Sequence, residues 1–593
     1  MNSSRVSGTI KTHVTRTRLK PNLRWRRPNN RYGYCSACDA AGLPDSPKAK
    51  KSTPTLKPLE PPPADHRIIG VQRELFTTSK YSPGSAIFLP NGTKIFNRLT
   101  NFLRSQYEHY GFQEVISPTI YKKSLWEKSG HWENYAEDMY SVSGHGAEGK
   151  KEDRQVGEDE EYGLKPMNCP GHCLIFASKK RSYRDLPIRY ADFSPLHRNE
   201  LTGALSGLTR GRRFHQDDGH IFCRPSQIRD EISKSLDFVR QAYGVLGLGS
   251  YRLALSTRPA DHFIGTIAEW DNAEAALRES LNSTQLPWTL NEGDGAFYGP
   301  KIDIILKDSD GKEHQTATIQ LDFQLPKRFE LEYQAPAPEL EQRGMTTNDS
   351  ELLAVEGSVT PVMIHRAVLG SVERMMALMI ERYDTSWPFW LNPNQVVIVT
   401  LNDTPELVEY ALKVKKTIQS ADNRTTAGFP YSNLPQVNGL SVAIDNNPEP
   451  LKKKIADAKS KKFGIIVVVG NKNIDQQNIN VDFAGLSKSQ YDVANHPILQ
   501  TWLEGQSKPK SSGTAIKSAQ VTHEPSTTEQ ILEVTKAKPE SEILERTLES
   551  DGGKSVAENS KPPNPLTTKQ LRNVDLSPAN LRVILEDLRA AYV

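Results

Sequence analysis

The sequence changes its pattern after Trp390, and this change is the strongest constraint on the fold. Apolar runs that suit strands span residues 395–401, 440–444 and 463–469, and they alternate with runs at helical spacing over residues 405–419 and 449–461. Strands that are apolar along their whole length are buried on both faces, as happens when helices cover both sides of a sheet. This part of the chain is therefore predicted to form a small α/β domain.

The part before Trp390 follows a different pattern. Apolar residues recur at helical spacing from Thr93 to Tyr110, and a strand that ends at Pro118 follows. Strand patterns then dominate up to about Pro326, with one helix predicted over residues 268–282. A further helix, with one apolar face, is predicted from Arg366 to Glu381.

Three segments carry no clear periodicity. Residues 143–161 and 334–359 are predicted to be surface insertions. Residues 506–570 contain no Phe, Trp or Tyr, so they bury too little apolar surface to fold and are predicted to be disordered. The chain then closes with a predicted amphipathic helix, for which Ser577 suits the N-cap and Pro578 the first turn.

The N-terminus has the composition of a targeting segment. The first 38 residues are rich in Arg and Lys, contain no Asp or Glu, and lack the apolar run that a secretory signal peptide has. This combination is typical of an organellar transit peptide, although an ordinary basic tail has a similar composition. The Pro- and Lys-rich residues that follow, up to about residue 64, are predicted to be a linker.

Overall composition excludes some classes of protein. The chain has 593 residues, a net charge of +4 and five cysteines, which is too few for a disulfide framework and favours a reducing compartment. No apolar run approaches the ~20 residues that a membrane-spanning helix needs. We therefore expect no membrane association.

Cysteine and histidine residues offer a candidate metal site, but spacing alone does not define it. Cys169, His172 and Cys173 lie close together around Pro170-Gly171, without a fourth ligand nearby. His220 and His365 occur in apolar contexts, where a histidine is more often a hydrogen-bonded core residue. A catalytic zinc takes three protein ligands from anywhere in a fold, so a site made of Cys169, His220 and His365 is one hypothesis.

Arginines offer a candidate phosphate site. Arg198 precedes a Gly-rich loop that contains Arg210, and Arg374 lies on the helix predicted from Arg366. Guanidinium groups match phosphate oxygens in a bidentate manner. The alternatives are a basic loop that contacts RNA or solvent, and a surface ion pair for Arg374.

Several ordered segments resemble the class II aminoacyl-tRNA synthetases, and among them the threonyl-tRNA synthetases. His197-Arg-Asn-Glu200 with Arg210-Gly-Arg-Arg-Phe214 resembles motif 2 of the class, Gly370-Ser-Val-Glu-Arg374 resembles motif 3, and the helix and strand ending at Pro118 resemble motif 1. The threonine-specific resemblance rests on further segments, which are Trp126–Tyr135, Lys165–His172, Ser182–Pro187, Gln216–His220, Gly295–Lys301, Gln320–Phe323 and His365–Gly370. It extends from about Asp65 to about Ser487.

The resemblance implies an α+β fold. A class II catalytic domain with an antiparallel six-stranded sheet is expected over residues 65–390, and a small α/β anticodon-binding domain over residues 391–505. Residues 1–64 are assigned to the transit peptide and linker, residues 506–570 to the disordered segment, and residues 571–593 to the C-terminal helix. A homodimer formed through motif 1 is expected.

The resemblance also implies which residues act. Cys169, His220 and His365 are expected to bind one substrate-contacting Zn²⁺, with Mg²⁺ accompanying ATP. Arg198, Arg374 and His131 are expected to be catalytic, with Arg198 on the α-phosphate and His131 near the terminal ribose of tRNA. The expected residues that bind substrate or ATP are Met167, Glu200, Arg210, Phe214, Gln216, Asp218, Tyr298, Lys301 and Gln320.

The implied activity is that of a threonine–tRNA ligase, acting on L-threonine, ATP and tRNA(Thr) in the mitochondrial matrix. No hydrolytic module for Ser-tRNA is recognisable before the catalytic segment, so post-transfer editing is not expected and serine should be misactivated. Two alternatives remain. One is a serine-activating class II enzyme with a similar zinc site, and the other is a non-catalytic paralogue that binds RNA or acts as a scaffold.

Overall fold

The structure is a computed structural model that describes residues 64–143, 161–261, 263–384, 387–420, 438–483, 485–486, 496–501 and 571–592. The transit peptide, its linker and the question of an editing module before the catalytic segment concern residues 1–63, which lie outside the described residues. The disordered segment at 506–570 and nearly all of the insertion at 143–161 also lie outside them.

An eight-stranded sheet forms the centre of the larger body, in the order β12-β11-β13-β14-β17-β10-β7-β3. The six strands from β11 to β7 are antiparallel, as predicted, and the short edge strands β12 and β3 add to them in parallel. The strands are β3 (Gln113–Glu114), β7 (Ile188–Asp192), β10 (Asp218–Cys223), β11 (Arg252–Ser256), β12 (Trp288–Asn291), β13 (Lys301–Lys307), β14 (Glu313–Asp322) and β17 (Val362–Ala367).

The two faces of this sheet carry different side chains because neighbouring residues of a strand point to opposite sides. Ile221 of β10 and Ile364 of β17 belong to the main hydrophobic core. Phe222 and Met363, the next residue in β10 and the preceding one in β17, belong to a smaller cluster on the other face. Polar residues such as His220 and His365 alternate with the core residues along these strands. The second face can therefore hold a binding site.

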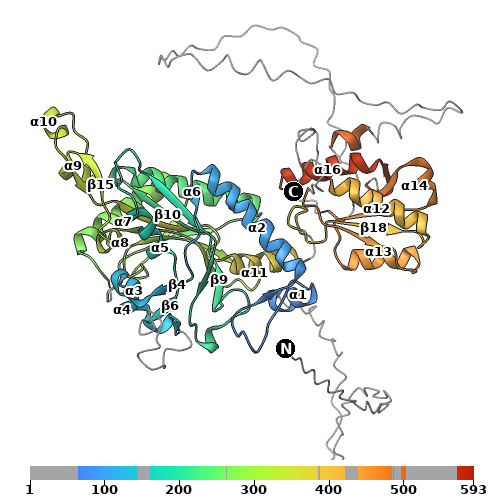
Figure 1. Ribbon diagram of the computed structural model, residues 1–593, viewed down its shortest axis with the longest axis horizontal. Helices are drawn as coiled ribbons and strands as arrows, with labels where there is room; N and C mark the ends of the chain where they lie inside the picture. Colours follow the sequence, from blue (N-terminus) through green and yellow to red (C-terminus); the bar gives the residue numbers. More distant parts are fainter. Residues whose placement is uncertain are drawn as a thin grey trace, which may run out of the picture. The chain divides into compact units, whose positions relative to one another are not determined.

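Helices cover the apolar face, and several of them are labelled in Figure 1. They are α2 (Pro90–His109), α6 (Ile228–Val245), α7 (Ile267–Ser283) and α11 (Val372–Tyr383). The helices predicted over 93–110 and 268–282 correspond to α2 and α7. No helix in the described part of the chain is both long and apolar enough to cross a membrane.

The predicted helix from Arg366 was wrong at its start. Residues 362–367 form strand β17, and α11 begins only at Val372. Gly370 lies between them with a φ of +72°, which interrupts regular structure. The apolar spacing of Val368 and Leu369 continues into the helix, and this concealed the boundary.

The stretch at 333–359 is structured, contrary to the predicted insertion without regular elements. Its ends pair as strands β15 (Tyr333–Pro336) and β16 (Glu356–Val359), with helices α9 (Pro338–Gln342) and α10 (Ser350–Leu353) between them. Tyr333 and Val359 are buried in a small cluster with Leu186. The hydroxyl of Tyr333 donates to Glu341, which also pairs with Arg224.

Shorter elements pack around the large sheet and its helices. They are α1 (His66–Gln72), β1 (Phe76–Thr77), β2 (Ile87–Phe88), β4 (Ile120–Lys122), α3 (Lys123–Ser129), α4 (His131–Tyr135), β5 (Ser141–Val142), β6 (Tyr162–Leu164), α5 (Cys169–Ala177), β8 (Pro195–His197), β9 (Arg213–His215) and α8 (Gln324–Arg328). Strands β4, β6 and β5 form a small sheet, and β8 pairs with β9 as a hairpin.

A second hydrophobic core belongs to a five-stranded sheet with the order β19-β18-β20-β21-β22. Strands β19, β18 and β20 are parallel, and they correspond to the three apolar runs of the predicted small α/β domain. The elements are β18 (Val396–Thr400), α12 (Pro405–Gln419), β19 (Val442–Asp445), α13 (Leu451–Ser460), β20 (Ile465–Val469), α14 (Asn471–Gln476), β21 (Ile479–Asp482), β22 (Val574–Leu576) and α16 (Pro578–Ala590).

The C-terminal segment completes this second body. Strand β22 pairs with β21, and it was not predicted from the sequence. The predicted helix is present as α16, in which the Ser577 side chain accepts from the Asn580 backbone N–H. Leu581, Leu585 and Leu588 are buried in the second core. The apolar stripe of the helix therefore packs within the same body as β18 and α12.

Replacing Leu585 with Ala should destabilise this body by about 2–5 kcal/mol, because the side chain is fully buried and its loss leaves a cavity. Replacing the exposed Val583 of the same helix with Ala should change stability by no more than about 0.5 kcal/mol. Urea unfolding of both full-length variants measures the difference. Equal midpoints would show that α16 is not packed in the core.

Candidate active site

Three neighbouring strands align polar residues in one row across the sheet. His220 of β10 is the register partner of His365 in β17, and His365 is in turn the partner of Gln320 in β14. All three residues lie on the face opposite the main core. The antiparallel pairing therefore brings together two histidines that are 145 positions apart in the sequence.

Cys169, the first residue of α5, completes a potential metal-binding group. Ligand atoms of Cys169, His220 and His365 all lie within 4.8 Å of one another, and all three residues are buried. Nε2 of His220 and Nδ1 of His365 are 2.9 Å apart. One thiol and two imidazoles are a donor set that suits a catalytic zinc with an open position.

The remaining ring nitrogens of the two histidines have partners of their own. Nε2 of His365 lies 2.8 Å from a carboxylate oxygen of Asp322, and Nδ1 of His220 lies 2.7 Å from Nδ1 of His172. Histidine ligands of metals are usually oriented by such a second contact, most often to a carboxylate. His172 thus supports a predicted ligand, although its own spacing had suggested a ligand role.

The segment that contains Cys169 is anchored by buried polar contacts. The Lys165 ammonium, which has no exposed surface, donates to the hydroxyl of Ser117 at 2.8 Å and lies 3.6 Å from Asp192. The Asn168 amide donates to the Asp218 carboxylate at 3.0 Å. Burial raises the pKa of Asp218. Asn168 therefore orients the acid predicted to contact substrate, a role that its sequence position did not reveal.

Ten of the predicted residues line one cavity beside the metal-binding group. The Tyr298 ring lies against His365, with 5.1 Å between ring centroids, and Lys301 pairs with Asp303 at 2.9 Å. The ten are Met167, Cys169, Arg198, Gln216, Asp218, His220, Tyr298, Lys301, Gln320 and His365. The cavity is therefore polar, with a row of potential ligands at one end.

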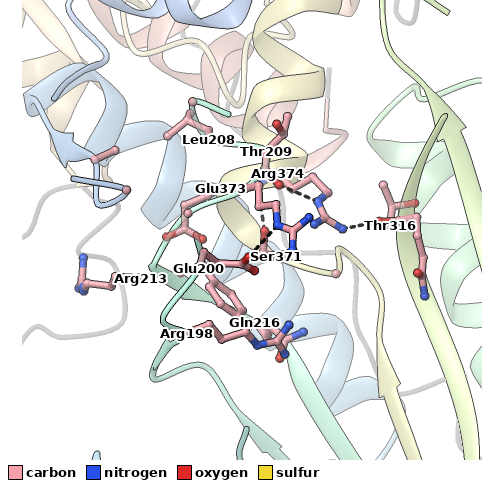
Figure 2. Close-up of a pocket in the computed structure, with 18 of the residues that line it drawn as sticks. Arg198, Glu200, Leu208, Thr209, Arg213, Gln216, Thr316, Ser371, Glu373 and Arg374 are labelled. Atoms are coloured by element: carbon pink, nitrogen blue, oxygen red, sulfur yellow. Dashed lines mark hydrogen bonds and ion pairs between the residues drawn. The ribbon is translucent and has the colours of Figure 1, made fainter. Parts of the chain in front are cut away.

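A second cavity is rich in arginine. Figure 2 shows Arg198, Glu200 and Arg374 converging on it from different elements. Arg210 and Phe214 also line it, and the Arg198 guanidinium lies 5.0 Å from the centroid of the Phe214 ring. Arg198 and Gln216 line both cavities, so the two are adjacent at these residues.

The charges in the second cavity favour an anionic ligand. Burial, followed by the proximity of Arg198 and Arg210, lowers the pKa of Arg374. Arg210 is paired with Glu200 at 2.7 Å, while Arg374 donates to the backbone oxygens of Thr209 at 3.0 Å and Gln315 at 2.7 Å. A polyphosphate would relieve the repulsion among these guanidinium groups.

The junction between β17 and α11 fixes the position of Arg374. The Ser371 hydroxyl accepts from the backbone N–H of Arg374 and caps the helix. A Cβ added to Gly370 would lie 2.1 Å from the carbonyl oxygen of Thr316, so no larger residue fits without a backbone shift. This close approach places the start of α11 against β14.

His131 does not line either of these two cavities. It has no exposed surface, and its Nε2 lies 3.9 Å from the Cys169 sulfur. Burial lowers its pKa to about 3, so the ring is neutral at physiological pH. His131 therefore contacts Cys169 from outside the two cavities, and its role toward tRNA stays a prediction.

The sequence did not single out Asp217. Both of its carboxylate oxygens accept backbone N–H groups, from Val368 at 2.7 Å and from Leu369 at 2.9 Å. The Tyr107 hydroxyl of α2 also donates to it at 3.0 Å. Burial raises the pKa of Asp217 to about 6. In the sequence, Asp217 and Asp218 are two adjacent acids, and nothing there distinguishes the structural Asp217 from Asp218, which lines the cavity.

Residues 151–383 match the family described as the tRNA synthetase class II core domain (G, H, P, S and T), and residues 395–494 match the anticodon binding domain family. A probable mitochondrial threonine–tRNA ligase of Schizosaccharomyces pombe is 47% identical over 72% of this chain and 85% of its own length. The mitochondrial threonine–tRNA ligase of Saccharomyces cerevisiae is 45% identical over 74% of this chain and 90% of its own length.

A solved structure is also similar to this chain over most of its length. It is described as the RNA binding domain of threonyl-tRNA synthetase from Cryptosporidium parvum, and it aligns with a TM-score of 0.60 and 42% identity over 71% of this chain and 92% of that one. The chain spans about half the length of the cytoplasmic threonine–tRNA ligases that it matches.

Two glycine replacements test the close approach at the junction. Gly370 and Gly311 have φ values of +72° and +78°, so alanine at either position should cost about 1–3 kcal/mol in backbone strain. A Cβ at Gly311 meets nothing within 4 Å, whereas at Gly370 it meets backbone. Thermal unfolding should therefore show a larger loss for Gly370→Ala, and equal losses would contradict the argument.

Proposed function

The chain belongs to the threonine–tRNA ligases, within the class II tRNA synthetases, and from this we propose that it activates L-threonine with ATP and transfers it to tRNA(Thr) in the mitochondrial matrix. The observation that carries the proposal is the pair of adjacent cavities joined at Arg198. One ends at a Cys–His–His group suited to zinc, and the other is lined by arginines.

In the first step, the carboxylate of threonine attacks the α-phosphorus of ATP in line and expels pyrophosphate. Arg198 lines both cavities, so its guanidinium can contact the carboxylate and the α-phosphate together. It neutralises the charge that develops on the α-phosphate as the new bond forms. Catalysis rests mainly on this positioning and charge neutralisation, because the protein makes no covalent bond to the substrates.

The remaining residues of the arginine-rich cavity hold the nucleotide. We propose that Phe214 stacks on adenine and that Arg210 and Arg374 bind the outer phosphates. Glu200 holds Arg210 at 2.7 Å until the phosphates arrive. Mg²⁺ enters with ATP and shares the neutralisation of its charge.

The other cavity selects the amino acid. We propose that Cys169, His220 and His365 bind one Zn²⁺, which supplies a template for the amino and hydroxyl groups of threonine when bound. Asp218, oriented by Asn168, accepts a hydrogen bond from the threonine hydroxyl, and Tyr298 lies near the amino group. Met167, Gln216, Lys301 and Gln320 complete the lining.

This arrangement predicts a particular order of specificity. A site built for a hydroxyl rejects an analogue that lacks one by ~10⁴–10⁵, so valine should be excluded. Serine retains the hydroxyl and lacks one methyl group, which is worth only ~1–3 kcal/mol. Serine should therefore be activated measurably.

Transfer to tRNA involves the second body. We propose residues 65–390 as the catalytic domain and residues 391–505 as the anticodon-binding domain, with residues 571–593 added to the latter because β22 and α16 complete its sheet and core. A ribose hydroxyl of the terminal adenosine then attacks the carbonyl carbon of the adenylate, so that an ester bond forms and AMP leaves. We assign His131 to this step, with its ring near the terminal ribose of the bound tRNA.

We propose a homodimer formed through the motif 1 region. Strand β3 is the edge of the large sheet, and the nearby Ile116 is 84% exposed. An edge strand offers unpaired backbone groups to another chain, and an exposed apolar side chain beside it favours burial.

The activity is tested by ATP–pyrophosphate exchange with threonine, serine and valine, followed by charging of mitochondrial tRNA. We expect strong exchange with threonine, weaker exchange with serine and none with valine. Preference for serine would identify the serine-activating alternative. No exchange by a zinc-loaded preparation would favour a non-catalytic protein.

Removal of one proposed ligand tests the zinc site. Cys169→Ala should lose bound zinc and at least about 100-fold in threonine-dependent exchange, because a three-ligand site does not retain the metal with two imidazoles. Cys173→Ala is the matched control, since this buried thiol contacts Met363 instead. Elemental analysis reports zinc independently of activity, and full zinc content in Cys169→Ala would refute the assignment.

A further inference from the structure

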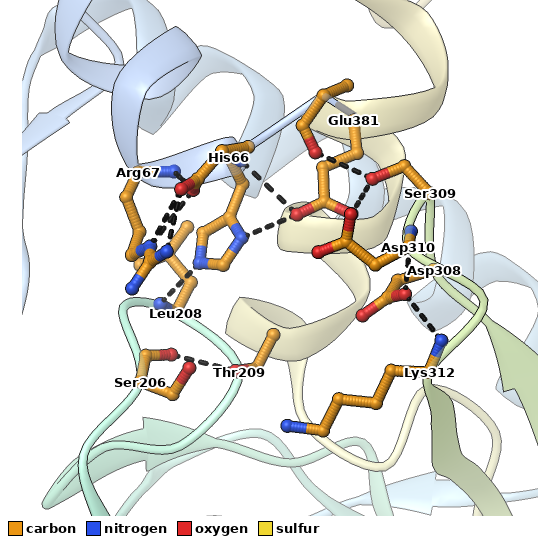
Figure 3. A network of polar contacts seen from close by, with 12 residues as sticks. His66, Arg67, Ser206, Leu208, Thr209, Asp308, Ser309, Asp310, Lys312 and Glu381 are labelled. Atoms are coloured by element: carbon orange, nitrogen blue, oxygen red, sulfur yellow. Dashed lines mark hydrogen bonds and ion pairs between the residues drawn. The ribbon is translucent and has the colours of Figure 1, made fainter. Parts of the chain in front are cut away.

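His66 lies at the start of α1 and contacts the helix that carries Arg374. Its side chain is almost fully buried, and its Nδ1 lies 2.8 Å from Oε1 of Glu381 in α11. The backbone N–H of His66 donates to the same oxygen at 3.2 Å. Figure 3 shows the ring between Glu381 on one side and the loop at Leu208 on the other.

The second ring nitrogen of His66 contacts that loop. The backbone N–H of Leu208 donates to Nε2 at 3.2 Å, so Nε2 must be the unprotonated nitrogen. Nδ1 then carries the hydrogen and donates it to Glu381. The two partners therefore select one neutral tautomer, and both nitrogens are used, which argues against a metal site at Asp65, His66 and Glu381.

The loop contacted by His66 forms a wall of the arginine-rich cavity. Leu208 and Thr209 both line it, and the carbonyl oxygen of Thr209 accepts from Nε of Arg374 at 3.0 Å. Arg374 and Glu381 are seven residues apart, so they lie on the same face of α11, two turns from each other. Helix α11 therefore holds two consecutive residues of the loop. Arg374 bonds to Thr209 directly, and Glu381 acts on Leu208 through His66.

The fit between His66 and the loop is close. A Cβ added to Gly207 would lie 2.3 Å from Nε2 of His66, and Gly207 has a φ of +50°. Glu381 is fixed as well, because the Ser309 hydroxyl lies 3.3 Å from its other oxygen and donates to the Ala64 carbonyl. The loop at Gly207 thus has little room to move while this contact is intact.

We propose that His66 is a positioning residue that holds the backbone of residues 207–209 in the conformation required for Arg374 to bind the outer phosphates of ATP. The inference rests on the proposed function, because it assigns ATP to the arginine-rich cavity. His66 lines neither cavity and touches no substrate, so it acts through Leu208 and Thr209. Its loss should weaken ATP binding without a matching effect on threonine.

Two amide replacements separate the two contacts of the imidazole. His66→Gln carries its amide where Nε2 lies and can still accept from the Leu208 N–H. His66→Asn carries its amide where Nδ1 lies and can bond to Glu381 but not to Leu208. The variants are matched in polarity and sit at the same helix position, and each retains the contact that the other loses.

The test measures KM for ATP and for threonine in pyrophosphate exchange by the full-length protein. His66→Asn should raise KM for ATP by roughly 10-fold, as expected when one oriented contact to a binding loop is lost, and leave KM for threonine within about 2-fold. His66→Gln should restore most of the ATP affinity. Thermal unfolding of both variants controls for a general loss of stability.

Several results would overturn the proposal. It fails if both variants bind ATP normally, if both lose ATP affinity equally, or if KM for threonine rises as much as KM for ATP. If His66→Asn does not fold, Glu381→Ala against Glu381→Gln repeats the test, because glutamine retains an acceptor for Nδ1. Equal KM values for ATP in that pair would also refute the role of His66.

The proposed function can fail separately. If the wild-type protein shows no threonine-dependent exchange, calorimetric binding of a non-hydrolysable ATP analogue still compares His66→Asn with His66→Gln. Weaker binding by His66→Asn alone would support the positioning role without the ligase activity. Absence of analogue binding by the wild type would refute both.

Discussion

The antiparallel pairing of β10 with β17 is the interaction on which the site depends. It places His220 opposite His365 and, through β14, extends the row to Gln320. A shift of the register by one residue would move this polar row to the face that packs on the helices, where Ile221 and Ile364 now lie. The hydrophobic core therefore enforces the geometry of the site, because only one register buries the apolar residues of both strands.

Much of this architecture could be predicted from the sequence. The apolar strands at 395–401 and 463–469 indicated a small α/β domain with buried strands, and β18 and β20 are neighbours in its sheet. Local spacing could not establish that Cys169, His220 and His365 converge, since that depends on the pairing of distant strands. The resemblance to threonyl-tRNA synthetases supplied this grouping, and the ligand atoms do lie within 4.8 Å of one another.

The errors have a common physical origin. The helix predicted from Arg366 began too early, because apolar spacing does not distinguish a buried strand followed by a turn from a continuous helix. The roles of Asp217 and His66 were missed because each depends on contacts with distant backbone: Val368 and Leu369 in one case, Leu208 in the other. A sequence read locally reveals which residues can titrate or donate, but not which backbone they meet.

The pairing of β22 with β21 has a consequence for how the second body matures. Ile479 and Leu576 are partners in the sheet, although a long stretch of chain separates them. A ribosome releases the earlier strands first, so β21 remains an open edge, with Ile479 and Val481 uncovered, until the final helix and strand have emerged. During that interval the nascent body presents a template for unwanted strand addition. Residues 574–588 thus complete the core around Ile479 and Val481, and a chain that lacks them would leave these two side chains uncovered.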